Sequence, residues 1–119
     1  MVASKTKARK ATVLPGQPVR GSRTGRPVMA LLDLLGRRWA LRVLWELRDG
    51  QAITFRSLQA RCGGISSSVL NDRLRELRDA EIVAAESSSG YHLTAHGREL
   101  LVALAPLDAW AKRWERRSR

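Results

Sequence analysis

The sequence predicts one mainly α-helical domain that carries a small β-hairpin. Apolar residues recur at helical spacing in five segments between residues 27 and 119, and β-forming residues flank a Ser/Gly turn in one segment, residues 82–94. A chain of 119 residues is long enough to bury one hydrophobic core and too short for two domains. The predicted class is therefore α+β, with four helices before the hairpin and one after it.

The first 26 residues differ in composition from the rest of the chain. They contain seven basic residues and no acid, so they carry +7 of the formal net charge of +11. Because they hold almost no large apolar side chains, burial cannot offset the entropy of ordering them. We expect residues 1–26 to be a disordered basic arm and residues 27–119 to be the folded domain. The basic residues of the arm are Lys5, Lys7, Arg9, Lys10, Arg20, Arg23 and Arg26.

Two helices are predicted at the start of the folded domain. Pro27 suits the first turn of a helix and Gly36 suits its exit, and Leu31 and Leu35 lie between them at helical spacing. Residues 37–50 form a second amphipathic segment that is apolar on more than one side and ends at an Asp-Gly pair. This second helix is expected to be central in the fold.

A third, short helix is predicted after Thr54, whose side chain can cap the first turn. A Gly-Gly pair at residues 63–64 ends it. Phe55, Leu58 and Cys62 recur on its apolar side, where cysteine usually behaves as a small hydrophobic residue. As the single cysteine of the sequence, Cys62 cannot form an intramolecular disulfide.

The fourth helix is predicted over residues 66–80, with Ser66 as its N-cap. Leu70, Leu74 and Leu77 form the stripe that would be buried. The remaining surface and the exposed N-terminal end carry Ser67, Ser68, Asn71, Asp72, Arg75 and Asp79.

These polar residues are of the types that hydrogen-bond to base edges. Arginine pairs with guanine, asparagine with adenine, serine with either, and acids with cytosine. The alternative is a solvated helix face on which Asp72, Arg75 and Glu76 interact only with one another.

The hairpin of residues 82–94 and the helix after it complete the domain. Ser88 and Ser89 lie at the predicted hairpin tip, where their hydroxyls can bind phosphate but bring no charge. A plain connecting hairpin is the alternative. The last helix, residues 95–119, carries an apolar face that includes Leu100, Leu104, Leu107, Trp110 and Trp114.

The order of four helices, a hairpin and a final helix is that of a winged helix-turn-helix. The segments LDLLGRRWALRVLWEL, FRSLQ, GISSSVLNDRLRELRDAEIV and YHLTAHG, in this order, resemble the HxlR-type regulators, a MarR-related branch of winged-helix bacterial transcription factors. The resemblance implies double-stranded DNA as partner and a role in transcription regulation.

Two positions depart from that family's pattern. The family often has a cysteine just before the proline of the first helix, where this chain has Arg26, so the redox switch of some members is not expected here. The hairpin is also short, and its tip lacks the arginine that often enters the minor groove.

In the arm, Gly25-Arg26-Pro27 resembles the core of an AT-hook, which implies DNA contacts by Arg23 and Arg26. A flexible lead into the first helix is the alternative.

The sequence thus predicts a sequence-specific DNA-binding regulator, expected to repress as a homodimer, because one reading helix contacts too few bases. An architectural or nucleoid-associated protein that coats DNA is the alternative. The predicted dimer interface consists of Leu31, Leu35, Leu100, Leu104, Leu107, Trp110 and Trp114.

Several other classes are disfavoured by the sequence. No apolar run approaches the roughly 20 residues of a membrane-spanning helix, and no signal peptide is seen. Cys62, His92 and His96 make a poor zinc set, and no catalytic constellation is recognisable. We expect a cytoplasmic, nucleoid-associated protein that is not an enzyme and has no cofactor or metal. The sequence assigns no small-molecule effector.

Overall fold

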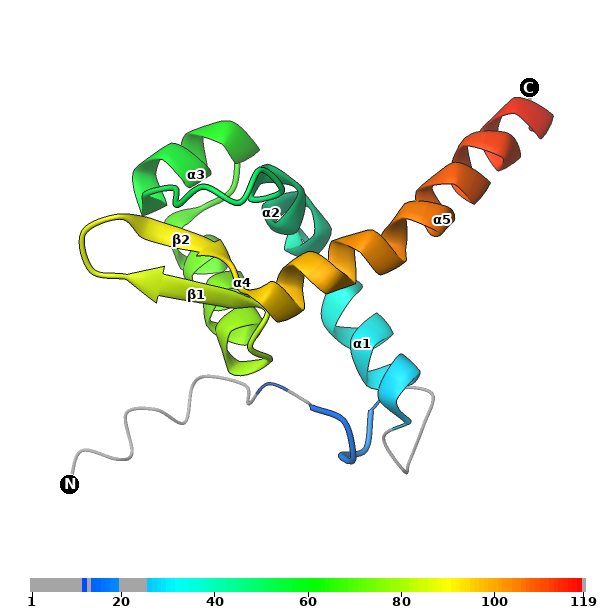
Figure 1. Ribbon diagram of the computed structural model, residues 1–119, viewed down its shortest axis with the longest axis horizontal. Helices are drawn as coiled ribbons and strands as arrows, with labels where there is room; N and C mark the ends of the chain where they lie inside the picture. Colours follow the sequence, from blue (N-terminus) through cyan, green and yellow to red (C-terminus); the bar gives the residue numbers. More distant parts are fainter. Residues whose placement is uncertain (1–11, 13, 20–25, 119) are drawn as a thin grey trace.

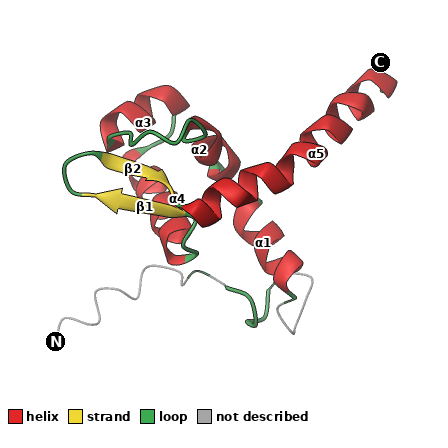
Figure 2. Cartoon of the chain, in the orientation of Figure 1, coloured by secondary structure: helices red, strands yellow, loops and turns green. Residues whose placement is uncertain are grey.

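A computed structural model describes residues 12, 14–19 and 26–118 of the 119-residue chain. Five helices and a two-stranded antiparallel hairpin follow one another in the predicted order (Figures 1 and 2). The elements are α1 (Pro27–Leu35), α2 (Ala40–Glu46), α3 (Phe55–Cys62), α4 (Ser67–Asp79), β1 (Val83–Glu86), β2 (Gly90–Leu93) and α5 (Ala95–Arg117). The predicted α+β class with a winged helix-turn-helix is confirmed.

The second helix is shorter than the sequence suggests, but it is central as expected, because it packs against α1, α3 and α4. It ends at Glu46, and the chain continues through turns to Gly50, which has a positive φ of 82°. Val43 and Leu44 are fully buried, but Leu41 and Trp45 on the other side are 50 % and 57 % exposed. The apolar residues on two sides of α2 therefore serve two purposes, because one side fills the core and the other forms a surface.

The core lies where α2, α3, α4 and the hairpin meet. The predicted leucine stripe of α4 lies in it, and a leucine of β2 closes it from the hairpin side. The largest side chains with less than 2 % exposure are Val43, Leu44, Leu47, Leu58, Leu70, Leu74, Leu77 and Leu93. Burying that many large aliphatic groups, at about 1.5–3 kcal/mol each, holds α4 firmly on the rest of the domain.

The hairpin is attached to the start of α3 as well as to α4. β1 pairs with β2 in antiparallel register, with Val83 opposite Leu93. Ile53 then extends the sheet by an isolated bridge to Tyr91, with two backbone N–H···O bonds of 2.8 Å. A Cβ at Gly90 would lie 2.2 Å from the carbonyl oxygen of Ile53, so only glycine permits this close approach.

The last helix, α5, projects away from the rest of the molecule (Figure 1). It begins at the N-cap Thr94, whose side chain accepts a hydrogen bond from the Gly97 amide, and it continues through Pro106. Of the 23 residues of α5, Gly97 is the one that is buried. The described residues therefore leave a large part of the apolar surface of α5 exposed. None of the described helices is both long and apolar enough to traverse a membrane.

Candidate nucleic-acid interface

The fourth helix has the two faces that the sequence predicts. One side of the helix is buried and carries Leu70, Leu74 and Leu77. The other side is exposed in the first half of the helix, where it carries Ser67, Ser68 and Asn71. The Ser66 side chain caps the helix by accepting from the Val69 amide at 3.2 Å. The exposed polar end of α4 is therefore a fixed surface rather than a frayed terminus.

Each of the three serines at this end has a local contact. Gln59 of α3 donates through Nε2 to Ser67 Oγ at 3.1 Å and to the Ile65 carbonyl at 3.3 Å, and the hydroxyls of Ser66 and Ser68 lie 3.4 Å apart. Gln59 thereby fixes the turn between α3 and α4. The sequence analysis did not find this residue, because its only signal is one polar side chain in the last turn of α3.

Arg75 lies between two carboxylates of its own helix. Its guanidinium nitrogens are 3.9 Å from Asp72 and 3.8 Å from Asp79, and the Arg75 side chain is 24 % exposed. Both separations exceed hydrogen-bonding distance, so the pairs are loose and the planar donor fork is not committed to either acid. The alternative interpretation of this face expected its charged residues to interact with one another. The structure shows such an interaction between Asp72 and Arg75.

Glu76, which the alternative interpretation placed on that face, is buried instead. It is 3 % exposed and accepts from Arg37 at 3.1 Å and from Arg73 at 3.2 Å. Arg37 also pairs with Asp33 of α1 at 3.3 Å. The segment between α1 and α2 covers this side of α4. It contains Arg37, whose charge offsets the cost of burying the Glu76 carboxylate.

The hairpin tip carries the serines as predicted, with Ser88 and Ser89 exposed. Glu86, at the end of β1, pairs with His92 Nε2 at 3.4 Å. Tyr91 packs against the core, in agreement with the sequence interpretation. The tip offers hydroxyl groups and no cation of its own.

The described part of the arm meets α4 at the C-terminal end of that helix. Thr12 donates from Oγ1 to Asp79 Oδ2 at 2.9 Å. Arg26 is exposed at the N-cap of α1, and Arg23 lies outside the described residues. The disorder predicted for residues 1–26 also falls largely outside them.

Cys62 is buried as predicted, at 3 % exposure on the core side of α3. Burial raises the pKa of its thiol, and Glu46 adds to the rise, while the nearby Arg42 acts in the opposite direction. A protonated, covered thiol is a poor nucleophile.

The residues expected at a dimer interface fall into three groups. Leu107, Trp110 and Trp114 are exposed by 59 %, 52 % and 59 %, and the two tryptophan rings stack with centroids 5.8 Å apart. Leu31, Leu100 and Leu104 are partly buried against the core. Leu35 is 6 % exposed and packs inside the core of the single chain, so no surface of it is left for a partner.

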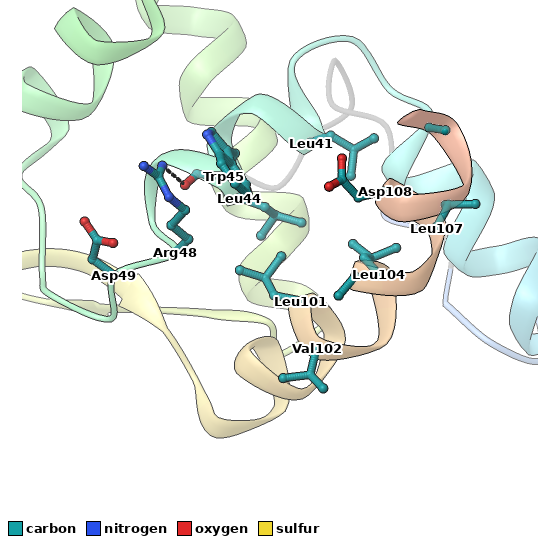
Figure 3. A pocket seen from close by; sticks show the side chains of 12 residues that line it. Leu41, Leu44, Trp45, Arg48, Asp49, Leu101, Val102, Leu104, Leu107 and Asp108 are labelled. Carbon is teal, nitrogen blue, oxygen red and sulfur yellow. Dashed lines mark hydrogen bonds between the residues drawn. The ribbon is translucent and has the colours of Figure 1, made fainter. Parts of the chain in front are cut away.

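An apolar groove runs between α2 and α5 (Figure 3). Leu44 and Leu101 point toward one another across it, and Leu107 lies at its far end. The Arg48 guanidinium covers the Trp45 ring at 4.2 Å from the centroid and donates to the Trp45 carbonyl at 3.0 Å. The exposed side of α2 and the exposed side of α5 thus form one continuous apolar surface.

Comparisons with known proteins agree with this geometry. An HTH-type transcriptional regulator of Synechocystis is 33 % identical over 94 residues, which cover 74 % of this chain and 69 % of that protein. An HTH-type transcriptional regulator of Methanocaldococcus jannaschii is 26 % identical over 91 residues, covering 73 % and 84 %.

Solved structures give the same result. Quinone-bound YodB from B. subtilis aligns with a TM-score of 0.68 and 31 % identity, over 72 % of this chain and 94 % of that chain. An HxlR family transcriptional factor from Thermoplasma volcanium aligns with a TM-score of 0.65 and 27 % identity, over 82 % and 95 %. The family model of the HxlR-like helix-turn-helix matches residues 34–119. This chain is therefore a member of the HxlR-like helix-turn-helix family of DNA-binding transcriptional regulators.

Proposed function

We propose that this protein binds specific sequences in double-stranded DNA as a homodimer and represses transcription, with α4 in the major groove. The observation that carries the proposal is the division of α4 into a fully buried leucine face and a polar face. Asn71 and Arg75 are on the polar face, with Ser67 and Ser68 at its N-terminal end. A helix with these groups on a rigid support can place donors and acceptors against base edges.

The proposed dimer forms through α1 and α5. Val28 and Leu32 of α1 are 59 % and 54 % exposed, and Val102 of α5 is 74 % exposed, in addition to the exposed leucine and tryptophans farther along α5. Large apolar side chains exposed in this number indicate an interaction site. Two copies related by a two-fold axis would present two reading helices to two half-sites.

The arm and the hairpin are proposed to contact the DNA backbone or minor groove on either side of α4. The Thr12–Asp79 hydrogen bond supports this for the arm, because it holds Thr12 at the C-terminal end of α4. Ser88 and Ser89 would donate hydroxyl hydrogen bonds to phosphate. The proposed location is the cytoplasm, at the nucleoid.

Selection of bound duplexes from a random DNA pool tests the proposal. We expect an enriched palindrome, and we expect Arg75→Ala to weaken binding to it by about 1–3 kcal/mol while leaving affinity for scrambled DNA nearly unchanged. Equal loss on both duplexes would show that α4 is only an electrostatic surface.

The architectural alternative has its own supporting observation. Seven of the eleven net positive charges belong to the arm, and the exposed hairpin tip is uncharged. Enrichment for A·T content without a palindrome would favour this alternative, in which the arm supplies most of the affinity.

A further inference from the structure

Arg78 is an exposed cation at the junction of the reading helix and the hairpin. It occupies the last turn of α4, which packs against β1. Within the described part of the chain its side chain makes no hydrogen bond or ion pair, whereas Arg75 one turn earlier lies between two carboxylates. The Arg78 guanidinium is therefore available to a ligand.

Arg78 borders two surface hollows, and Ala85 of β1 borders both of them as well. The first is bounded by Arg78, the tip residues Ser87 and Ser88, and Thr54 at the start of α3. The second is bounded by Arg78 together with Arg75 and Ala84. Arg78 thus connects the polar face of α4 with the hydroxyls of the hairpin tip.

Two carboxylates border these hollows, and both are already engaged. Glu86 pairs with His92. Side chains alternate between the two faces of a strand, so Glu86 and His92 lie on one face of the hairpin and Ala85 and Tyr91 on the other. Asp79 accepts from Thr12 and lies beside Arg75. Neither acid forms an ion pair with Arg78 in the described residues.

We propose that Arg78, with the hydroxyls of Ser87 and Ser88, binds one backbone phosphate of the DNA that flanks the half-site contacted by α4. The guanidinium supplies the charge that the serine tip lacks, and the hydroxyls supply further donors to the same anion. This inference rests on the proposed function and adds the residue that makes the hairpin side of the interface cationic.

The test compares Arg78→Ala with the full-length wild type on the operator obtained by selection, at several salt concentrations. Losing one phosphate contact should reduce the slope of log affinity against log salt by about 0.9. Between about 50 and 200 mM salt, the advantage of the wild type should therefore shrink about 3.5-fold. Operator and scrambled duplexes of equal length should show the same change, since a phosphate contact carries no sequence information.

Duplex length supplies the positional control. On an operator trimmed so that no phosphate lies beneath the hairpin, wild type and Arg78→Ala should bind equally. Arg78→Lys keeps the charge and should keep the slope. Arg116→Ala removes the same charge from the far end of α5 and should change neither duplex (Figure 1).

An unchanged slope for Arg78→Ala on the long duplex, or an equal loss on the trimmed one, would overturn the inference. A fall in thermal stability without a change in slope would also overturn it, because it would assign Arg78 to stabilising the helix C-terminus. Failure of the wild type to select any operator would instead overturn the proposed function, and this inference with it.

Discussion

Replacing the buried carboxylate of Glu76 should destabilise the domain without touching its apolar core. Glu76→Gln keeps the size of the side chain and removes its charge. It leaves Arg37 and Arg73, whose side chains are only 21 % and 15 % exposed, without their shared counter-ion. The loss of folding stability therefore comes from two poorly hydrated arginine side chains rather than from a cavity.

The size of the loss can be bounded from the structure. Breaking a buried ion pair by removing one partner costs about 3–5 kcal/mol. Three features reduce this value here: both arginines keep some contact with water, Arg37 retains Asp33, and the glutamine oxygen still accepts one hydrogen bond. We expect a decrease of about 2 kcal/mol in the free energy of unfolding.

Urea unfolding at fixed protein concentration measures this decrease, and thermal unfolding should show a melting temperature lower by about 8–16 °C for a domain of this size. Glu99→Gln is the matched control, because the Glu99 side chain is 81 % exposed and its nearest partner, His96, is 4.0 Å away. A change below about 0.5 kcal/mol for Glu76→Gln, the range of ordinary surface substitutions, would refute the reasoning.

Four further outcomes are expected. Glu81→Gly should stabilise the protein by about 0.5–1 kcal/mol in urea unfolding, because Glu81 has a φ of 62° that glycine adopts without steric cost; a loss of stability would contradict this. Gly97→Ala should destabilise by about 1–3 kcal/mol, since its Cβ would lie 2.2 Å from the Ile82 carbonyl oxygen; wild-type stability would show that the backbones separate easily. Cys62 should react with a thiol reagent more slowly than free cysteine at neutral pH, because burial keeps it protonated, and mild oxidation should leave DNA affinity unchanged; a reversible loss absent in Cys62→Ser would contradict this. Trp114→Glu should shift the protein to monomer in sedimentation at micromolar concentration, because Trp114 is 59 % exposed on the apolar face of α5; a monomeric wild type would remove the basis of the proposed dimer.

The sequence predicted those parts of the fold that depend on neighbouring residues. The caps Thr54 and Ser66 sit at the starts of their helices, and the leucine stripe of α4 is buried, because capping and helical periodicity act over one or two turns. The hairpin was placed correctly because a Ser/Gly turn between β-forming residues is also a local signal.

The parts that were missed depend on contacts distant in sequence. Glu76 is buried because Arg37, 39 positions earlier, reaches it, and no periodicity within α4 contains that information. Leu35 belongs to the core rather than to an outer face, because α1 packs on α2 at that point. The proximity of Arg78 to the hairpin tip also depends on tertiary packing, since no pattern within α4 specifies it.

The attachment of α5 gives it the mechanics of a lever arm. The first turn of α5 packs closely at Gly97 against Ile82, which lies between α4 and β1. Trp114 is 17 residues farther along α5, or about 26 Å at the helical rise per residue. A tilt of about 10° at the root would displace the tip by about 4–5 Å over that length. In the proposed dimer, such a tilt would change the separation of the two α4 helices, so substitutions around Gly97 and Ile82 should alter the preferred spacing between half-sites while the bases preferred within each half-site stay the same.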